Sequence, residues 1–332
     1  MTAEFDSVLL IAFGGPERME DIRPFLTNVT RGRRIPPERL DEVAHHYELI
    51  GGRSPLNELT FRQAAALQAA LARDGASLAV YVGMRNWTPY FHETLARMAA
   101  GGMRRALAII MAPHQSYSSW RQYQDNVAEA RERVGAAAPE VTYAPPWFDR
   151  AGFIDAMAER VTEALAGVPA DRRGRTPLVF TAHSIPTEMA KASPYVEQIT
   201  TSARLVADRL GQPRWSVAYQ SRSGDPRAPW LEPDVLDVIR KLRVEGIRDV
   251  VVVPIGFVCD HVEVLYDLGI EARAVAEEIG LGFHRASTVN DHPAFIRMLA
   301  EIAREAVSRQ PSAVSSEPDT PSPDPRPPTP AA

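Results

Sequence analysis

Short apolar runs alternate along this chain with longer stretches in which apolar positions recur every three or four residues. Fully apolar short runs are typical of parallel strands buried on both faces, and the longer stretches are typical of amphipathic helices. The pattern predicts strands at 7–13, 78–82, 106–111, 141–143, 178–182, 215–219, 249–254 and 282–285. It predicts helices near 19–30, 36–49, 58–73, 88–101, 118–134, 150–166, 195–210, 233–245, 262–279 and 291–308. This alternation indicates an α/β fold with parallel sheets and right-handed crossovers.

The strand–helix rhythm runs twice, over about 7–145 and about 175–308. It therefore predicts an N-terminal half, 1–150, and a C-terminal half, 151–310. In such folds ligands bind beyond the carboxyl ends of the strands, often between domains. Residues 311–332 hold eight of the 28 prolines and little that is apolar. They predict a disordered Pro-rich tail that is either solubilising or a ligand for a proline-binding domain.

Charge and cysteine content exclude several classes of protein. The formal net charge is −5, so binding of nucleic acid through a general basic surface is not expected. Cys259 is the single cysteine, which rules out an internal disulfide, a cysteine-based zinc site and an iron–sulfur cluster. No signal-peptide pattern opens the sequence, and the apolar runs fall far below the ~18–20 residues of a membrane span. We expect a cytoplasmic protein without a transmembrane segment.

Two segments of the first half could bind a ligand. The Phe-Gly-Gly-Pro segment at 13–16 lets the backbone approach a ligand closely, or it forms a plain strand-to-helix turn. It matches neither a dinucleotide-binding fingerprint nor a Walker loop. Arg31 and Arg33 precede a Gly-Gly-Arg-Ser-Pro loop at 51–55. Clustered arginines hold carboxylates or phosphates, or they form a solvated basic loop.

Side chains that follow two later strands are further candidates. Tyr117, Trp120 and Tyr123 follow the strand at 106–111 and either line a flat apolar pocket or pack in the core. His183 follows the strand at 178–182, where it either binds a metal and transfers protons or has a structural role. No Gly-x-Ser-x-Gly elbow is present, so a serine hydrolase of the α/β type is excluded.

A row of acids is the sharpest signal. Asp260, Glu263, Asp267 and Glu271 are spaced 3, 4 and 4 residues apart, which predicts that all four lie on one face of a helix. Like charges at this spacing destabilise a helix by about 0.2–0.5 kcal/mol per pair. The row is therefore either a path for a cation or a solvated helix face. His183 and Glu263 would give a metal few protein ligands, which suits a metal in transit better than a closed structural site.

Taken in order, these segments resemble the ferrochelatases. The matching motifs lie at 13–16, 51–55, 82–86, 182–186, 219–222, 229–233 and 254–271. The resemblance covers residues 6–308 and leaves only the tail outside. It implies two Rossmann-like chelatase domains with parallel sheets and a cleft between them. It also implies a lyase that forms nitrogen–metal bonds, inserting Fe²⁺ as its substrate into a porphyrin.

The resemblance assigns roles to residues. It makes His183 the iron ligand that also takes pyrrole protons and Glu263 its partner across the cleft, and it extends an acidic path for metal or protons through Asp260, His261, Asp267 and Glu271. The residues that it places near the porphyrin are Phe13, Arg31, Arg33, His46, Tyr47, Ser54, Tyr123 and Trp230. Some relatives have a tyrosine in place of Phe13, which has no hydroxyl to reach the metal. The single cysteine excludes the iron–sulfur cluster of other relatives, and their membrane-associating segment is not evident.

The resemblance is greatest to the bacterial branch that acts on coproporphyrin III and gives Fe-coproporphyrin III, or coproheme, in haem biosynthesis. The segments at 30–33 and 112–114 point to that branch. Protoporphyrin IX, converted directly to protohaem, is the alternative substrate. Two other readings stay open, a cobalt or nickel chelatase and a non-catalytic porphyrin or haem carrier. A transient partner among the haem-pathway enzymes is also expected.

Overall fold

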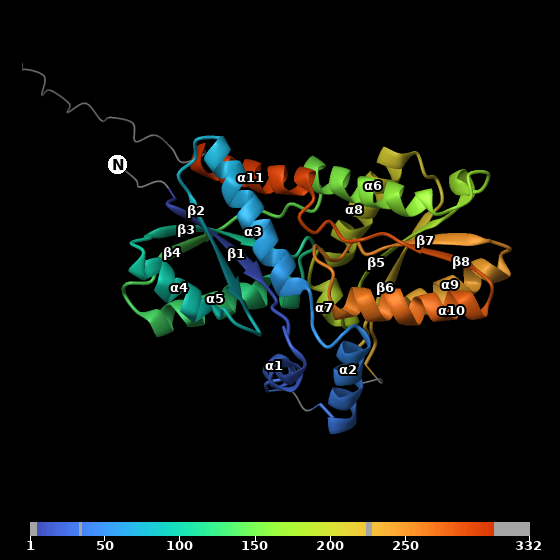
Figure 1. The fold of residues 1–332 in the computed structure, drawn as a ribbon, viewed down its shortest axis with the longest axis horizontal. Coiled ribbons are helices and arrows are strands. Elements are labelled where there is room, and N and C mark those ends of the chain that lie inside the picture. The colour runs from blue at the N-terminus through green and yellow to red at the C-terminus, as the bar shows by residue number, and fades with distance from the viewer. Residues whose placement is uncertain (1–4, 33–34, 224–227, 309–332) are drawn as a thin grey trace, which may run out of the picture.

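The computed structural model describes residues 5–32, 35–223 and 228–308, and its strands form two parallel sheets (Figure 1). The strands are β1 (Ser7–Ala12), β2 (Ala79–Met84), β3 (Arg105–Ile110), β4 (Glu140–Tyr143), β5 (Leu178–His183), β6 (Trp215–Gln220), β7 (Asp249–Val253) and β8 (Gly282–Arg285). The first sheet has the order β2-β1-β3-β4 and the second β6-β5-β7-β8. The predicted α/β class and both parallel sheets are confirmed, because the central strands β1, β5 and β7 are apolar and almost wholly buried.

Helices cover both faces of each sheet (Figure 1). The α-helices are α1 (Ile22–Val29), α2 (Pro37–Leu49), α3 (Leu56–Arg73), α4 (Phe91–Ala100), α5 (Gln122–Val134), α6 (Ala151–Ala166), α7 (Thr187–Lys191), α8 (Tyr195–Leu210), α9 (Val235–Val244), α10 (Arg273–Glu278) and α11 (Pro293–Ser308). Two 3₁₀ segments, η1 (Met19–Asp21) and η3 (Arg173–Arg175), and two π-helical segments, η2 (Tyr117–Arg121) and η4 (Glu263–Ala272), complete the elements. Each predicted helix is present. The sequence pattern missed α7, because five residues are too few to show a helical period.

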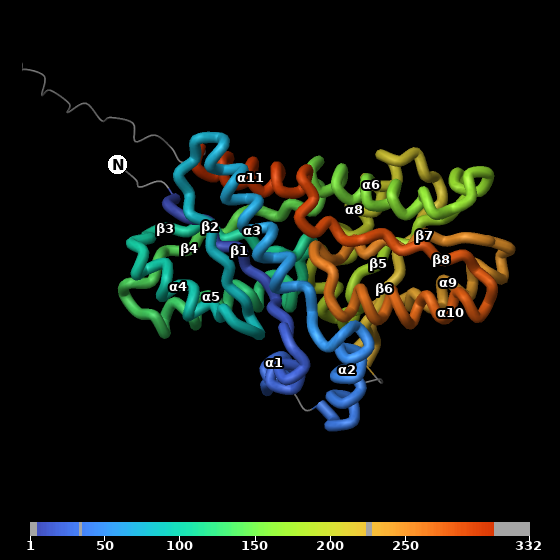
Figure 2. Tube along the Cα trace, in the orientation of Figure 1, coloured from blue at the N-terminus to red at the C-terminus, as the bar shows by residue number. Residues whose placement is uncertain are grey.

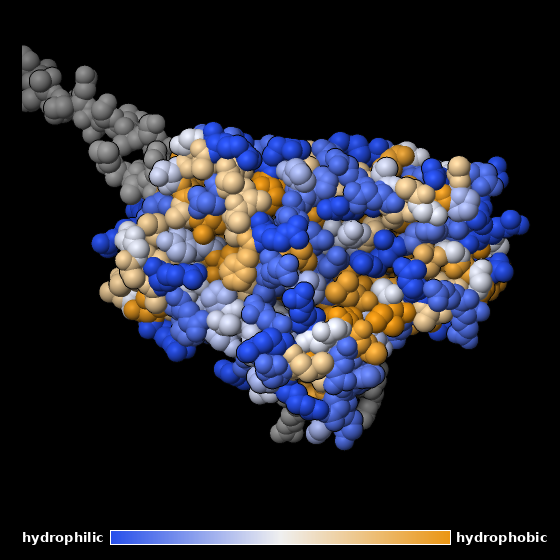
Figure 3. Space-filling view, viewed as in Figure 1, coloured by the Kyte–Doolittle hydropathy of each residue, from blue (hydrophilic) through white to orange (hydrophobic). Residues whose placement is uncertain are grey.

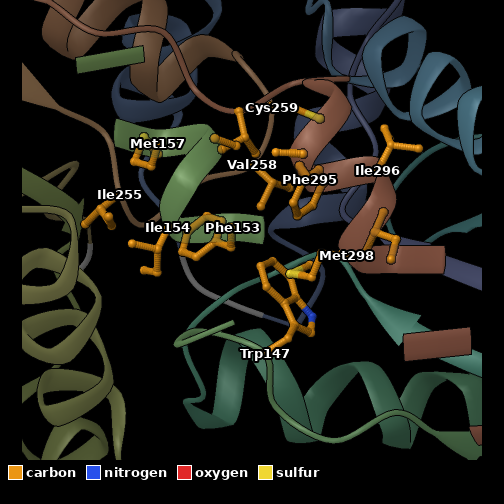
Figure 4. Close-up of a cluster of buried hydrophobic side chains, with 14 of the residues drawn as sticks. Trp147, Phe153, Ile154, Met157, Ile255, Val258, Cys259, Phe295, Ile296 and Met298 are labelled. Atoms are coloured by element: carbon orange, nitrogen blue, oxygen red, sulfur yellow. The ribbon is translucent and has the colours of Figure 1, made fainter. Parts of the chain in front are cut away.

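The two sheets share one hydrophobic core. Trp147, in the connection between the halves, packs against Phe153 of α6 and Phe295 of α11, with ring centroids 5.3 and 5.6 Å away (Figure 4). The same cluster reaches Leu10 of β1 and Val251 of β7. The chain returns at its C-terminal end so that α11 lies beside both α3 and α6 (Figure 2). Residues of both halves therefore bury each other's apolar surface.

A small lobe of α1 and α2 projects from this body (Figure 1). It has its own apolar cluster, in which Phe25, Leu26 and Tyr47 are buried. Phe13, at the end of β1, and Val262, just before η4, pack against that cluster. On the face seen in Figure 3, apolar side chains gather where the lobe meets the second half. The lobe therefore stands over the carboxyl ends of strands from both sheets.

Two predictions fall outside the residues that the structure describes. They are the Pro-rich tail at 311–332 and the porphyrin contact of Arg33. Within the described ranges, none of the helices combines the length and apolar character needed to cross a bilayer.

Candidate active site

His183 is the last residue of β5, at the carboxyl end of the second sheet. Its Nδ1 atom bonds the carbonyl oxygen of Ser184, and the Tyr195 hydroxyl donates to the His183 carbonyl oxygen at 3.0 Å. A carbonyl oxygen only accepts, so Nδ1 carries the proton of the neutral ring and Nε2 keeps its lone pair. The backbone thus presents His183 with a nitrogen that is free to bind a cation or take a proton.

Glu263 meets His183 from another segment. It begins η4, which follows β7, the strand that pairs with β5. Its Oε1 lies 3.7 Å from Nε2 of His183, and its Oε2 lies 3.7 Å from Nε2 of His261. Because the carboxyl ends of adjacent parallel strands meet at one edge, residues 80 positions apart come together there. The structure therefore places a carboxylate between two imidazoles.

The electrostatics of this group favour an ionised Glu263. Burial alone would raise the pKa of its carboxyl, but the positive charge that His183 and His261 carry when protonated outweighs that effect, and the pKa falls below its ordinary value. An ionised carboxylate beside an imidazole nitrogen is a donor set that suits a divalent transition metal. Among the described residues, no group of three or more His, Cys, Asp and Glu side chains is arranged to hold a metal ion as a closed site.

Asp267 and Glu271 continue from Glu263 along η4. The Ser221 hydroxyl donates to the Asp267 carboxylate. Burial, reinforced by the charge of Glu263, raises the pKa of Asp267 to about 7. Burial and the charges of Asp234 and Glu42 also raise the pKa of Glu271. Asp267 therefore exchanges protons close to neutral pH.

The prediction that all four acids share one helix face is wrong for Asp260. The helical segment begins after it. Its carboxylate faces the end of β8 and the loop that follows, where it lies 3.2 Å from Arg285 Nη1 and accepts from the Thr288 hydroxyl at 3.4 Å. A nearby cation and hydroxyl turn Asp260 away from the row. The predicted helix is also π-helical here, with hydrogen bonds from residue i to i+5.

Those residues assigned to the porphyrin that the structure describes lie around the same edge, on both halves. Tyr47, Ser54 and Tyr123 are buried, Phe13 and Trp230 are half-buried, and Arg31 is exposed at the end of α1. The negative charge of Glu263 adds to burial in raising the pKa of both Tyr47 and Tyr123, which places these hydroxyls within its electrostatic reach.

His46 makes a contact that the sequence does not indicate. Its ring stacks on that of Tyr266, with centroids 3.6 Å apart and planes at 13°. His46 belongs to α2 in the lobe and Tyr266 to η4 in the second half. The stack therefore joins the α1–α2 lobe to the segment of the second half that carries Glu263. Burial lowers the pKa of the His46 imidazole.

The backbone geometry explains why glycine occupies positions 14 and 15. Gly14 has a φ of +83°, which non-glycine residues rarely adopt. A Cβ on Gly15 would lie 2.8 Å from Cβ of Ser54. The Gly15 amide donates to Asn57 Oδ1 at 2.9 Å, and Asn57 Nδ2 donates back to the Gly15 carbonyl at 3.0 Å. This segment is a tight turn that brings Phe13 and Ser54 into one wall.

Sequence reasoning missed Tyr195 and Tyr266 as site residues and did not assign roles to Gln220 and Ser221. Gln220 ends β6 and lies opposite His183 in the strand register. Its position directly after an apolar strand was the available signal. The two tyrosines lie on helices whose approach depends on tertiary packing, and the sequence carries no signal for them.

Comparison with known proteins identifies the chain's relatives. The sequence model of one family, described as Ferrochelatase, matches residues 6–307. The chain belongs to the ferrochelatase family. It is 46% identical over 306 residues to the "Ferrochelatase" of Rhodopirellula baltica, covering 92% of this chain and 87% of that protein. It is 45% identical over 308 residues to the "Coproporphyrin III ferrochelatase" of Nocardia farcinica, covering 90% and 88%.

A solved structure agrees on the fold. The sirohydrochlorin chelatase SirB from Bacillus subtilis subspecies spizizenii, in complex with cobalt, covers 92% of this chain and 96% of its own, with a TM-score of 0.55 and 11% identity. The two sheets are thus the two Rossmann-like domains of the chelatase fold. As a member of the ferrochelatase family, this chain is a metal-inserting enzyme of haem biosynthesis, and the family uses Fe²⁺ as its substrate.

Proposed function

We propose that this ferrochelatase inserts Fe²⁺ into coproporphyrin III and releases Fe-coproporphyrin III. The observation that carries this choice is a cationic pocket of about 660 Å³ next to Tyr123 of the proposed porphyrin wall. Arg31, Arg85 and Arg133 line it, and Glu129 is the one acid among its lining residues. Arginine binds carboxylates through two parallel hydrogen bonds, so the pocket suits propionate groups.

The pocket adjoins the proposed porphyrin wall. The Arg85 guanidinium lies over the Tyr123 ring at 5.7 Å, and Asn86 donates from Nδ2 to the Phe13 carbonyl at 3.2 Å. Coproporphyrin III has four propionates, whereas protoporphyrin IX replaces two of them with vinyl groups. A propionate in this pocket can pair with a guanidinium group, whereas a vinyl group cannot, which favours coproporphyrin III. The names of relatives such as the Nocardia farcinica protein support the same choice.

The reaction exchanges two pyrrole protons for one Fe²⁺ and leaves the net charge of the porphyrin unchanged. We assign proton removal to Nε2 of His183, whose lone pair is free because Nδ1 bonds Ser184. Glu263, ionised beside it with Oε1 3.7 Å from that nitrogen, would hold the incoming cation. Asp267, with a pKa of about 7, and Glu271 form the path by which metal arrives or protons leave. Asp260 is bound to Arg285 and lies outside this path.

Anaerobic insertion of Fe²⁺ by the purified protein tests the proposal, with coproporphyrin III and protoporphyrin IX assayed side by side by loss of the free-base spectrum. We expect coproporphyrin III to be the better substrate. Arg133→Met should lower kcat/KM for coproporphyrin III about tenfold, the scale of one lost charge-assisted contact, and change protoporphyrin IX less.

The matched control is Arg104→Met, at an exposed arginine just before β3, which should leave kcat/KM for both porphyrins unchanged. A preference for protoporphyrin IX would make protohaem the direct product. Porphyrin binding without turnover would favour a carrier, and turnover with Co²⁺ or Ni²⁺ but not Fe²⁺ would favour another chelatase. A cytoplasmic location, the absence of an iron–sulfur cluster and a transient haem-pathway partner belong to the same proposal.

A further inference from the structure

Two consecutive residues at the end of β6 hold the helix that carries the acids. Gln220 donates from Nε2 to the carbonyl oxygen of Glu263, and Ser221 donates from its hydroxyl to the carboxylate of Asp267. Gln220 is 1% exposed and its amide lies 3.5 Å from the Ser221 hydroxyl. The strand end thus holds η4 at two points four residues apart, one through the backbone and one through a side chain.

Ser221 reaches Asp267 from an unusual backbone conformation. Its φ is +60°, and only Ser221 and Asn290 among the described non-glycine residues have a positive φ. This left-handed region is costly for most side chains and persists where the surroundings determine it. The backbone of β6 is in extended conformation up to Gln220 and turns at Ser221. This turn aims the hydroxyl at η4 instead of continuing the strand.

The Asp267 carboxylate depends on this contact. Within residues 5–32, 35–223 and 228–308, Ser221 is the one donor to it. Asp267 is half-buried beside the charged Glu263, so an unheld carboxylate would rotate away from a neighbour of like charge. The hydrogen bond opposes that repulsion and fixes one oxygen, leaving the other oxygen of the carboxylate available.

We propose that Ser221 is a positioning residue for iron delivery, whose hydroxyl holds the Asp267 carboxylate in line with the His183–Glu263 pair. The proposal rests on the proposed iron insertion and deepens it. It gives Ser221 no contact with iron or porphyrin. Loss of the Ser221 hydroxyl should therefore raise KM for Fe²⁺ more than KM for the porphyrin.

Three substitutions separate the hydroxyl from the backbone turn. Ser221→Gly removes the hydroxyl and suits a φ of +60° at no steric cost, so it tests the hydroxyl alone. Ser221→Ala removes the hydroxyl and keeps the conformational cost. Ser221→Thr keeps the hydroxyl but places a β-branched side chain in a region that such residues avoid, so it tests the backbone. Ser223→Gly, an exposed position in the same loop, is the matched control.

The measurements are steady-state kinetics of anaerobic Fe²⁺ insertion into coproporphyrin III, with each substrate varied in turn, and thermal unfolding. We expect Ser221→Gly and Ser221→Ala to raise KM for Fe²⁺ about tenfold, the effect of one lost hydrogen bond to a charged group. KM for the porphyrin should stay within about twofold of wild type, and the Tm of Ser221→Gly should not fall. Ser221→Thr should show the opposite pattern, with a lower Tm and a near-normal KM for Fe²⁺.

Wild-type KM for Fe²⁺ in Ser221→Gly overturns the inference, as does an equal rise in both KM values. A loss of activity that follows Tm across the three variants also overturns it, because the role would then be structural. These results differ from a failure of the proposed function, in which the wild-type protein inserts no Fe²⁺ into either porphyrin. In that case the inference falls with it.

Discussion

At the scale of single residues, the chemistry of the site depends on which partner each imidazole nitrogen and each carboxylate oxygen contacts. One nitrogen of His183 is bound by the backbone at Ser184, so only Nε2 faces Glu263. Glu263 in turn has one oxygen near His183 and the other near His261. This arrangement keeps a base and an anion side by side without a closed ligand set. A cation that binds there remains accessible to a second acceptor.

Replacing His183 tests this division of roles. We expect His183→Ala to abolish Fe²⁺ insertion, a loss of at least about a hundredfold, because general bases contribute about 10²–10⁴-fold. Porphyrin binding, measured by fluorescence quenching, should survive, because the proposed porphyrin wall is built from other residues. Substantial turnover in the variant would refute the assignment, and loss of porphyrin binding would move His183 into the binding wall.

His183 could be selected from sequence because it follows an apolar strand, and Glu263 because it belongs to a row of acids at helical spacing, while the resemblance to the ferrochelatases supplied their roles. The place of Asp260 could not be predicted, because its partner Arg285 ends β8, 25 residues further along the chain, and no residue near Asp260 indicates that contact. Ser221 and Tyr195 act through hydrogen bonds to other segments, and those partners follow from strand order and helix packing. The local sequence pattern does not predict residue roles that depend on such packing.

At the scale of elements, the predicted strands and long helices agree with the structure to within a few residues at their ends. Continuous apolar runs predicted β1, β5 and β7, because a short segment with almost every side chain buried is typical of a parallel strand covered on both faces. The π-helical form of η4 was not predictable, because acids at intervals of four residues suit both helix types. Elements of the two halves also meet through buried polar groups, as at the segment after β3.

His114, in that segment, gives a pH-dependent prediction. It is 1% exposed, its Nε2 lies 3.0 Å from Ser202 Oγ of α8, and burial lowers its pKa to about 3. Its pKa in the unfolded chain is near 6.5, so the unfolded state binds more protons between pH 6.5 and 3. The contribution of neutral His114 to the free energy of unfolding is therefore fully present above about pH 6.5. As the pH is lowered below that value, this contribution decreases by up to about 1.4 kcal/mol per pH unit, until the pH passes the pKa of the folded state.

Urea unfolding of wild type and His114→Gln over that pH range provides the measurement. The variant cannot gain a proton, so its stability should fall less steeply between pH 6.5 and 4 than that of the wild type. Both proteins are compared with themselves at pH 7.5, which removes any loss of packing caused by the substitution. Parallel curves for the two proteins would show that His114 does not titrate on unfolding.

At the scale of the whole molecule, the two halves form one packed body. Trp147, Phe153 and Phe295 lie in a core that also includes strands of both sheets. Two ion pairs tie α3 to the C-terminal segment, from Arg62 to Asp291 and from Arg304 to Asp74. Exposed ion pairs of this kind contribute about 0–1 kcal/mol each, so the apolar core dominates the coupling between the halves.

Phe295→Ala tests that coupling. The side chain is fully buried, so its loss should lower the free energy of unfolding by about 3–5 kcal/mol. Because the core is shared, both halves should still unfold in one transition, seen together by circular dichroism and tryptophan fluorescence. Two separate transitions, with only the second half destabilised, would show that the halves fold independently of each other.

The shared strand order of the two sheets has a consequence for the geometry of the reaction. In each sheet the strand that comes first in the chain lies second in the order, so β1 and β5 occupy equivalent places. The residue that follows β1 is Phe13, whereas the residue that ends β5 is His183. Two strands in equivalent places thus lead to unlike chemistry, with an apolar ring just beyond the end of β1 and an imidazole on the last residue of β5. For a flat ring held between them, one side would be inert and the other reactive, and the metal would have a single direction of approach.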